Sequence, residues 1–264
     1  MNYRIAILIT TFLRDNLLYK TLQTIVDNYS KDCIVLVADQ GYSDSEKDIT
    51  IDYYKSQIPL EYYKLPFDCG LSYARNFLVN KANEMNIPYI LMSADSIQFI
   101  QLYDFQPIIE IMESDKQLGI IGFELEGSKC QWEFNMELTP EGIKLLSPKE
   151  IIKTNNYIFK KIDIVRNIFL AKTKTMLNLY DNDLKLAEHE DAFLKYKSSG
   201  YKVYWTDSVL FKKINTNSSD EYKNYRKRFG DYRKLLCQKL GIKGWVIYSP
   251  ETMKEIKKYK NKKG

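Results

Sequence analysis

Three short runs of almost uninterrupted apolar residues occur in the first part of the chain, at residues 5–9, 33–38 and 89–92. Such runs are typical of strands that are covered on both faces of a parallel sheet. Between them, apolar residues recur three or four positions apart, which predicts a helix after Asp15 and another over residues 71–85. This alternation predicts an α/β fold with an open, largely parallel sheet flanked by helices and joined by right-handed crossovers.

The pattern is less regular after residue 95. Apolar residues at 118–123 and at 163–170 predict two further strands, whereas residues 127–156 are polar and aromatic and show no clear period. An acidic helix start at residues 188–191 is followed by a stop at Gly200 and by a strand pattern.

The last part of the chain is basic. Residues 219–239 predict a basic helix, and the remaining residues are weakly patterned. We therefore expect one α/β domain over residues 1–215, followed by a small basic helical extension and tail over residues 216–264.

Composition supports a globular protein, because the 264 residues are 45% hydrophobic and 28% charged. The net charge of +5 is unevenly placed, with cations concentrated in residues 223–239 and 257–263. Such a segment can contact anionic lipid or nucleic acid. A solvated helix face and a frayed terminus explain the same composition.

Several classes of site have little support in the composition. The four cysteines form no CxxC pair, and His189 is the single histidine, which argues against a zinc site, a disulfide framework and a Ser-His-Asp triad. The sequence contains no run of about 18 apolar residues, so no membrane span is predicted. We expect a cytoplasmic protein, with peripheral contact to an anionic membrane as a further possibility.

Two carboxylates mark the predicted binding edge of the sheet. Asp39 and Asp95 directly follow the second and third apolar runs. In open α/β sheets, ligands bind beyond the carboxyl ends of the strands. The sequence therefore predicts a ligand site that contains both residues.

Short motifs around these carboxylates fall in a distinctive order. They are ITT at residues 9–11 with Arg14 nearby, VLVAD at 35–39, CGLSYARN at 69–76, ILMSAD at 90–95 and EHED at 188–191. In order and spacing, about residues 3–215 resemble a family 2-like glycosyltransferase of the GT-A (Rossmann-like) fold.

The resemblance implies an enzyme of the hexosyltransferase kind that acts in polysaccharide biosynthesis. It would be an inverting enzyme, with a nucleotide sugar, expected to be a UDP-sugar, as donor and a hydroxyl of a glycan, glycolipid or other molecule as acceptor. Such an enzyme must hold the donor, stabilise the departing diphosphate and remove a proton from the acceptor.

Donor contacts are expected from residues that match the family motifs. These residues are Thr10, Thr11, Arg14, Asp39, Gly70, Arg75, Asn76 and Asp95. Asp39 would accept a hydrogen bond from a pyrimidine ring N–H, or would only stabilise the turn that follows it. Arg75 would contact the diphosphate or sugar, or would pair with a carboxylate such as Asp95.

The metal motif departs from the family. An Asp-x-Asp motif that binds Mn²⁺ or Mg²⁺ is usual, but here only Asp95 of residues 93–95 is acidic, which makes a divalent metal doubtful. Where many related enzymes carry a metal-binding histidine, this chain has Lys212 and Lys213. We expect weak or dispensable metal binding, with these lysines contributing charge toward the diphosphate, unless both lie on a solvated strand end.

The acidic helix start supplies the expected base. The resemblance assigns this role to Asp191, with Glu190 beside it, and a helix N-terminus favours the ionised form that a base requires. Ordinary acidic enrichment at a helix start is the alternative. On the acceptor side we expect Trp132 and His189.

Other functions remain open at this point. One is glycosylation of modified DNA bases, for which the basic C-terminal segment is the only indication. Another is a non-catalytic module that binds a sugar or nucleotide. A nucleotidyltransferase is disfavoured, because no glycine- and lysine-rich loop follows Ile9.

Overall fold

The computed structural model describes residues 3–128, 133–154, 156–215 and 218–263. The strands of its main sheet are β1 (Ile5–Thr11), β2 (Cys33–Asp39), β3 (Leu60–Lys64), β4 (Tyr89–Ala94), β5 (Ile97–Gln98), β6 (Leu118–Glu126), β9 (Glu150–Thr154), β10 (Tyr157–Ile162), β11 (Phe169–Lys172) and β12 (Lys202–Lys213). A second sheet contains β7 (Asn135–Thr139), β8 (Gly142–Leu146) and β13 (Val246–Tyr248). The helices are α1 (Asp15–Asp27), α2 (Ser45–Gln57), α3 (Leu71–Glu84), α4 (Gln106–Ser114), the 3₁₀ turn η1 (Thr173–Met176), α5 (Glu188–Ser198), α6 (Asp220–Lys227), α7 (Phe229–Leu240) and α8 (Pro250–Lys263).

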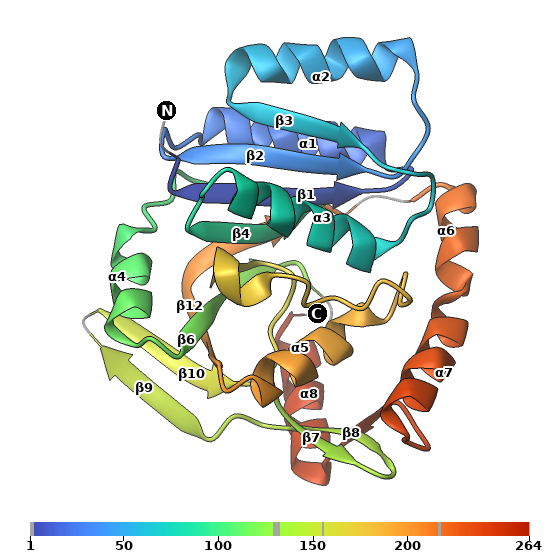
Figure 1. Cartoon of the computed structure of the whole chain (residues 1–264). Coiled ribbons are helices and arrows are strands. Elements are labelled where there is room, and N and C mark those ends of the chain that lie inside the picture. The colour runs from blue at the N-terminus through green and yellow to red at the C-terminus, as the bar shows by residue number, and fades with distance from the viewer. Residues whose placement is uncertain (1–2, 129–132, 155, 216–217, 264) are drawn as a thin grey trace.

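Within the described residues, the main sheet has the strand order β3-β2-β1-β4-β11-β6-β12-β10-β9, with β5 paired to β12 (Figure 1). The first four strands are parallel neighbours, as the apolar runs predict. β11 is antiparallel to both β4 and β6, so the sheet becomes mixed beyond this point. The carboxyl ends of β1, β2 and β4 meet at one edge, which is where ligands bind in such sheets.

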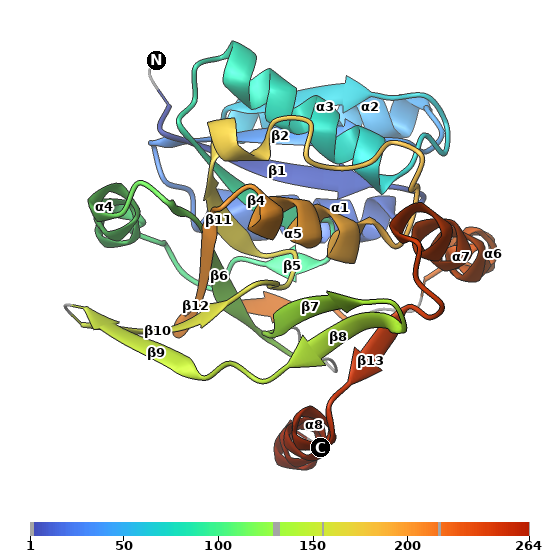
Figure 2. The same ribbon diagram turned by 60° about the horizontal axis from the view of Figure 1, so that its bottom comes forward.

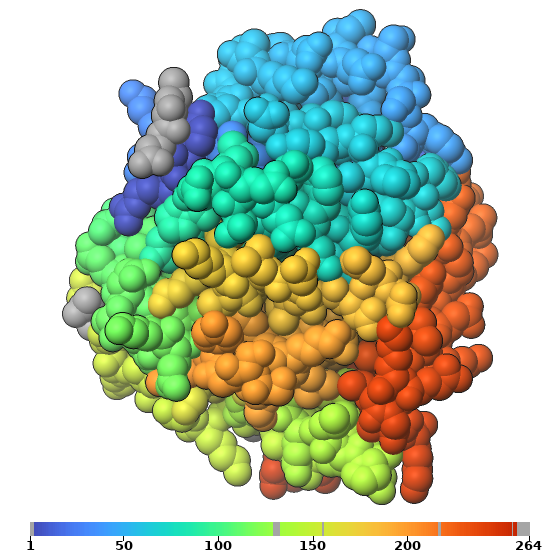
Figure 3. Space-filling view, in the orientation of Figure 1, coloured from blue at the N-terminus to red at the C-terminus, as the bar shows by residue number. Residues whose placement is uncertain are grey.

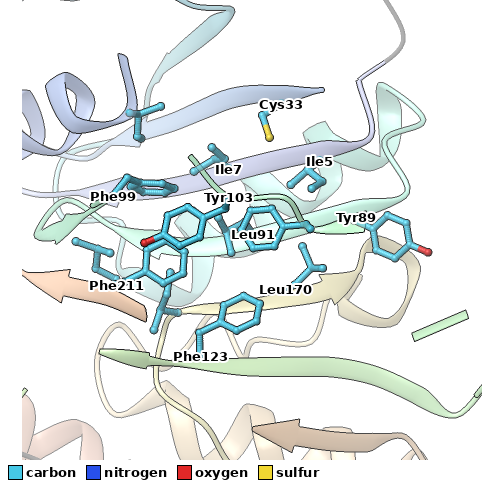
Figure 4. Close-up of a cluster of buried hydrophobic side chains, with 14 of the residues drawn as sticks. Ile5, Ile7, Cys33, Tyr89, Leu91, Phe99, Tyr103, Phe123, Leu170 and Phe211 are labelled. Atoms are coloured by element: carbon cyan, nitrogen blue, oxygen red, sulfur yellow. The ribbon is translucent and has the colours of Figure 1, made fainter. Parts of the chain in front are cut away.

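Helices cover both faces of the sheet. One face packs against α1, α2 and α4 in a cluster that includes Ile7, Leu91 and Phe123 (Figure 4). The other face packs against α3 and α5 through residues such as Leu8 and Leu78. Every residue of β1 and β2 is buried, because alternate side chains enter the two clusters. This confirms the α/β fold and the double coverage predicted from the apolar runs.

The strand predicted over residues 163–170 is largely wrong. β11 begins only at Phe169, and the preceding residues form a single bridge between Ile164 and Phe134. The segment is apolar because Ile164 and Val165 are buried against the sheet, and not because it pairs as a strand. Its polar residues explain the interruption, since Asp163 accepts a hydrogen bond from the Met136 N–H at 2.8 Å.

Two other regions differ from their predicted form. Residues 127–156, which show no period, contain β7, β8 and β9. These strands are short and partly exposed, so their pattern in the sequence is weak. The single basic helix predicted over residues 219–239 is divided into α6 and α7 at Arg228, which pairs with Asp68 elsewhere in the chain.

The C-terminal segment packs along one side of the N-terminal part. β13 extends the small sheet by parallel pairing with β8, and α8 follows it (Figure 2). α6 contacts the loop after β2, where the Tyr42 hydroxyl donates a hydrogen bond to Glu221 at 2.9 Å. The orange and red surface of α6 and α7 is accordingly continuous with the surface of residues earlier in the chain (Figure 3). No helix in the described residues has the length and apolar character needed to cross a membrane.

Gly122 shows how the segment before β11 is accommodated. A Cβ at Gly122 would lie 2.5 Å from Val165 Cγ1 and 2.7 Å from Val165 Cβ. Because Gly122 has no side chain, Val165 packs directly against the backbone of β6. This contact helps to bring Arg166 and Asn167 to the carboxyl edge of the sheet.

We predict that Gly122→Ala destabilises the protein by about 1–3 kcal/mol, because the added methyl group overpacks a closed contact. Gly230 in α7 is the matched control, since a Cβ there meets nothing within 4 Å. Gly230→Ala should leave stability unchanged or raise it by up to about 1 kcal/mol. Urea unfolding followed by circular dichroism measures both changes. Equal midpoints for Gly122→Ala and wild type would contradict the packing argument.

Candidate active site

A cavity of about 430 Å³ lies at the carboxyl edge of the sheet. Its walls come from the ends of β1 and β4, the start of α3, the loop before α5, and α6. The residues in these walls include Thr10, Thr11, Arg14, Gly70, Arg75, Asp95, Glu190 and Lys213. The structure thus brings together most of the residues that the sequence motifs mark, although they span more than two hundred positions.

Asp95 follows β4 and forms the floor of this region. Its side chain is fully buried, and its Oδ2 accepts hydrogen bonds from the Thr11 hydroxyl at 2.9 Å and from Arg14 Nε at 3.0 Å. Arg14 Nη2 donates to the other carboxylate oxygen, so the guanidinium binds Asp95 with two N–H groups. Burial raises the pKa of Asp95, and the charge of Arg14 acts in the opposite direction.

The backbone before Arg14 is strained in a way that supports this contact. Leu13 has a φ of 53°, in the left-handed region that bulky side chains rarely adopt. Such residues cluster where the surrounding structure holds a functional geometry. The turn at Leu13 directs the next residue toward the cavity, where the Tyr222 ring lies 4.7 Å from the Arg14 guanidinium carbon.

The start of α3 is held against the loop before α5. Gly70 has a φ of 98°, and a Cβ there would lie 2.7 Å from Lys185 Cα, so only glycine permits this approach. Arg75 is buried and pairs with Glu188 at 2.5 Å, and not with Asp95 as one reading of the sequence suggests. Asn76 lies outside the cavity lining and hydrogen-bonds both the N–H and the C=O of Tyr180.

In the first turn of α5, the adjacent carboxyl groups of Glu190 and Asp191 have different surroundings. Glu190 lines the cavity, and its Oε1 is buried without a hydrogen-bond partner. Burial raises the pKa of Glu190 to about 8, and Glu188 acts in the same direction. Asp191 is also buried but does not line the cavity, and its carboxylate pairs with Lys195 at 2.6 Å. The predicted base therefore lies one position away from the carboxyl group that faces the cavity.

His189 lies between Glu188 and Glu190 and lines the cavity, and its place on the acceptor side stays a prediction. Its Nε2 is 2.5 Å from the Val165 carbonyl oxygen, which requires a proton on this nitrogen. Burial lowers the pKa of His189 to about 4, so the ring is neutral at pH 7. The helix start itself is unusual, because Ala187 has a left-handed φ of 60°. Trp132, the other residue expected on the acceptor side, lies outside the described residues.

Residues 6–162, more than half of the chain, match the family described as glycosyl transferase family 2. The chain belongs to this family. Its fold is that of the GT-A enzymes. The match ends before α5, so it does not include the acidic residues of that helix.

Solved structures of glycosyltransferases share the fold at low sequence identity. TarS 1–349 of S. aureus in complex with UDP-GlcNAc has a TM-score of 0.61 and 12% identity, over 89% of this chain and 65% of that chain. The mannosyltransferase PcManGT from Pyrobaculum calidifontis in complex with GDP-Man and Mn²⁺ has a TM-score of 0.60 and 12% identity, over 97% and 68%. GalNAc-T7 with UDP, GalNAc and Mn²⁺ has a TM-score of 0.62 and 13% identity, over 97% and 55%. This chain spans 64%, 42% and 65% of three of the TarS chains it matches, which is less than two thirds of their length.

The groups around Asp95 do not form a ligand set that fits a divalent cation. Mg²⁺ sites commonly use one or two carboxylates together with phosphate and water oxygens. Both Asp95 oxygens already accept hydrogen bonds from Arg14 and Thr11, and the Lys213 cation lines the same cavity. Among the described residues, no group of three or more His, Cys, Asp or Glu side chains is arranged to hold a metal ion.

The two lysines at the end of β12 differ in position. Lys213 lines the cavity and pairs with Ile97 of β5, and Ile97 follows Asp95 by two residues. Lys212 pairs with Gln98 and does not line it. Successive side chains of a strand point to opposite faces, which explains the difference. Of the two lysines predicted to contact the donor, the structure places one at the cavity.

Asp39, which the sequence predicts as a donor contact, is engaged by groups of the protein itself. It is fully buried and does not line the cavity. Its Oδ1 accepts the Gly41 N–H at 2.7 Å, and its Oδ2 accepts from Tyr62 at 2.5 Å and from Lys47 at 2.9 Å. Burial would raise its pKa, but the hydrogen bonds from Tyr62, Gly41 and Lys47 outweigh burial, and the pKa of Asp39 is lowered. Asp39 therefore holds the end of β2, its neighbour Gln40 lines the cavity, and the donor contact of Asp39 stays a prediction.

Sequence reasoning misses the contribution of α6 to the cavity. Tyr222 and Tyr225 of α6 line it together with Arg228, which directly follows the helix and binds the Asp68 carboxylate through two nitrogen atoms at 2.9 and 2.7 Å. Tyr225 packs edge-to-face on Phe12 with ring centroids 5.0 Å apart. The alternating aromatic and basic residues of this helix were the available signal. Their charge suggested an external partner, whereas part of it is used inside the molecule.

We predict that Lys47→Ala destabilises the protein by about 3–5 kcal/mol, because it leaves the buried Asp39 carboxylate without its close cation. Lys64→Ala is the matched control, since Lys64 contacts the same Asp39 oxygen at 3.4 Å and its side chain is 33% exposed. This control should cost less than about 1 kcal/mol. Chemical unfolding at pH 7 measures both. A Lys47→Ala variant as stable as the Lys64→Ala variant would contradict a structural role for the Lys47–Asp39 pair.

Proposed function

We propose that this protein is an inverting glycosyltransferase. It transfers a sugar from a nucleoside diphosphate sugar, with a UDP-sugar as the expected donor, to a hydroxyl group of a glycan or glycolipid. The observation that carries the proposal is one cavity that holds both a buried carboxyl group, Glu190, and the cations Arg14 and Lys213. Inverting transfer needs these two kinds of group, a base for the acceptor proton and positive charge for the departing diphosphate.

We assign the base to Glu190 rather than to Asp191. A base must reach the acceptor hydroxyl, and of the two carboxyl groups it is Glu190 that lines the cavity. Its pKa of about 8 makes its carboxylate a stronger base than an ordinary glutamate. Asp191 is instead paired with Lys195, which partly offsets the rise in the pKa of Asp191 caused by burial, so its position outside the cavity lining is what argues against it as the base.

The cavity has a donor end and an acceptor end in this proposal. The donor end is formed by Thr10, Thr11 and the cations beside Asp95, where β1 and β4 finish. The acceptor end is formed by His189 and Glu190, where α5 begins. Residues 1–215 supply both ends, and the extension over residues 216–264 covers the cavity with Tyr222 and Tyr225.

The donor nucleotide is the next question. Similar structures were solved with UDP-GlcNAc, with UDP and with GDP-Man, so both uridine and guanosine donors occur on this fold. We favour UDP because most of these similar structures that name a nucleotide hold UDP or a UDP-sugar. Since Asp39 is engaged within the protein, base recognition would fall to other groups of the cavity, such as Gln40.

A thermal-shift panel tests the donor class. A ligand that binds the folded state alone raises Tm, and at 100 times its Kd it adds about 2.7 kcal/mol of stability. We expect UDP-sugars to raise Tm more than GDP-sugars do. ADP-ribose is the control, as an unrelated diphosphate. A response to GDP-sugars alone would replace UDP by GDP, and no response to any nucleotide sugar would contradict the proposed function.

We predict that Glu190→Gln lowers transfer or donor hydrolysis by about 100- to 10,000-fold and leaves nucleotide binding nearly intact. Asp191→Asn, which changes the adjacent carboxyl group, should have a much smaller effect. In the wild type, kcat/KM should fall about tenfold per pH unit below pH 8, because the protonated base is inactive. The reverse order of the two variants would return the role of base to Asp191.

A further inference from the structure

The Arg14 guanidinium is fixed at the place where the sugar diphosphate must be neutralised. Two of its five N–H groups bind Asp95, which leaves N–H groups for a further anion. The Arg14 side chain is 21% exposed, and it lines the cavity while Asp95 beneath it is fully buried. The left-handed backbone at Leu13 and the ring of Tyr222 hold it from two further sides.

Lys213 provides a second cation close to this group. It lies at the end of β12, opposite Ile97 of β5, and so it faces the segment that follows Asp95. Its ammonium group forms no ion pair or hydrogen bond with any described residue. Among the other cations of the cavity, Arg75 binds Glu188 and Arg228 binds Asp68, whereas Arg226 lies over the Phe229 ring at 5.4 Å. Arg14 binds Asp95, and Lys213 lies opposite the segment that follows Asp95, so these two cations are placed at the donor end of the cavity to receive a phosphate group.

A divalent cation would have to compete with this arrangement. The Asp95 oxygens accept three hydrogen bonds, two from Arg14 and one from Thr11. A metal ligated by Asp95 would displace the guanidinium and leave two positive groups, Arg14 and the metal, side by side. The charge that family members obtain from a metal is already supplied here by side chains.

We propose that Arg14, oriented by Asp95 and assisted by Lys213, takes the place of a divalent cation in binding the donor diphosphate. In the reaction, the bond between the anomeric carbon and the phosphate oxygen breaks, and its electron pair goes to the diphosphate. The acceptor oxygen forms the new bond to the anomeric carbon and loses its proton to Glu190. Arg14 and Lys213 stabilise the negative charge that develops on the diphosphate. The inference rests on the proposed nucleoside diphosphate sugar donor.

Nucleotide binding tests the inference without any acceptor. Isothermal titration calorimetry would compare UDP, GDP and uridine, in EDTA and in Mn²⁺. We expect the wild type to bind its nucleoside diphosphate, UDP or GDP, with the same affinity in EDTA as in Mn²⁺. Arg14→Gln and Lys213→Ala should each weaken diphosphate binding by about 10- to 100-fold, the value of a charge-assisted hydrogen bond, and should leave uridine binding unchanged. Arg14→Lys should recover part of the loss.

Lys212→Ala is the matched control for Lys213→Ala, because it removes the same charge one residue away and outside the cavity lining. Diphosphate binding by Lys212→Ala should match that of wild type. A loss of equal size in both variants would show a general effect of net charge, and would overturn the role of Lys213.

Asp95 acts through Arg14 in this proposal, so it is a positioning residue. A double-mutant cycle separates this role from metal binding. Asp95→Asn should weaken diphosphate binding, but in the Arg14→Gln background it should add little to the loss. Melting temperatures identify variants that fail to fold. If Arg14→Gln does not fold, the comparison of Lys213→Ala with Lys212→Ala, together with the wild-type EDTA result, decides the question.

Diphosphate binding that disappears in EDTA, returns with Mn²⁺ and is unaffected by Arg14→Gln would overturn the inference. This outcome differs from a failure of the proposed function. If neither UDP nor GDP binds in any buffer, the nucleotide-sugar donor itself is wrong. If a nucleotide binds but requires Mn²⁺, only the replacement of the metal by Arg14 is wrong.

Discussion

Buried charge at the carboxyl edge of the sheet is the constraint on which the rest of the site depends. A carboxylate withdrawn from water is costly unless cations and hydrogen-bond donors replace the water. The chain satisfies this requirement with pairs that join separate elements, namely Asp39 with Lys47, Asp95 with Arg14 and Glu188 with Arg75. Each pair connects a strand end or helix start to another element. The same contacts that neutralise charge therefore also set the shape of the cavity.

Glu190 is the exception to this pattern, and the exception is informative. It is as buried as the paired carboxylates, but its Oε1 has no hydrogen-bond partner, and burial raises its pKa to about 8. A group held in this way weakens the fold and is retained where it serves chemistry. The left-handed residues Leu13 and Ala187 lie near the two ends of the same cavity and add to this local cost. Strain and unpaired polarity thus coincide with the region where the reaction is proposed.

The C-terminal extension completes the cavity although its sequence suggested a separate role. Arg228 binds Asp68 by a two-point contact, and Tyr222 lies over Arg14. The sequence alone does not identify the partner of a lysine or arginine, because an external phosphate and an internal carboxylate both attract a cation. The basic composition of residues 219–239 therefore indicated binding but could not distinguish an outer surface from an inner wall.

Local periodicity by itself determined the first half of the fold. Apolar runs and three-to-four spacing are direct consequences of burial on two faces or on one, so β1, β2, β4, α1 and α3 could be predicted from them. The motif order was also sufficient to indicate the family and the edge of the sheet that holds the site. The pattern failed at residues 163–168, because residues that pack across a strand are as apolar as residues that pair within one.

Only the tertiary structure decided which of the marked residues face the cavity. Asp39 and Asp95 have the same sequence context, a carboxylate after a buried strand, yet Asp39 is enclosed by Lys47 and Tyr62 and Asp95 lies on the cavity floor. Glu190 and Asp191 are adjacent, and the 100° turn per residue of a helix directs one to the cavity and the other to Lys195. The physical reason is that the orientation and partners of each carboxyl group depend on how the elements pack together, including contacts such as Asp95 with Thr11 and Arg14, which no local pattern records.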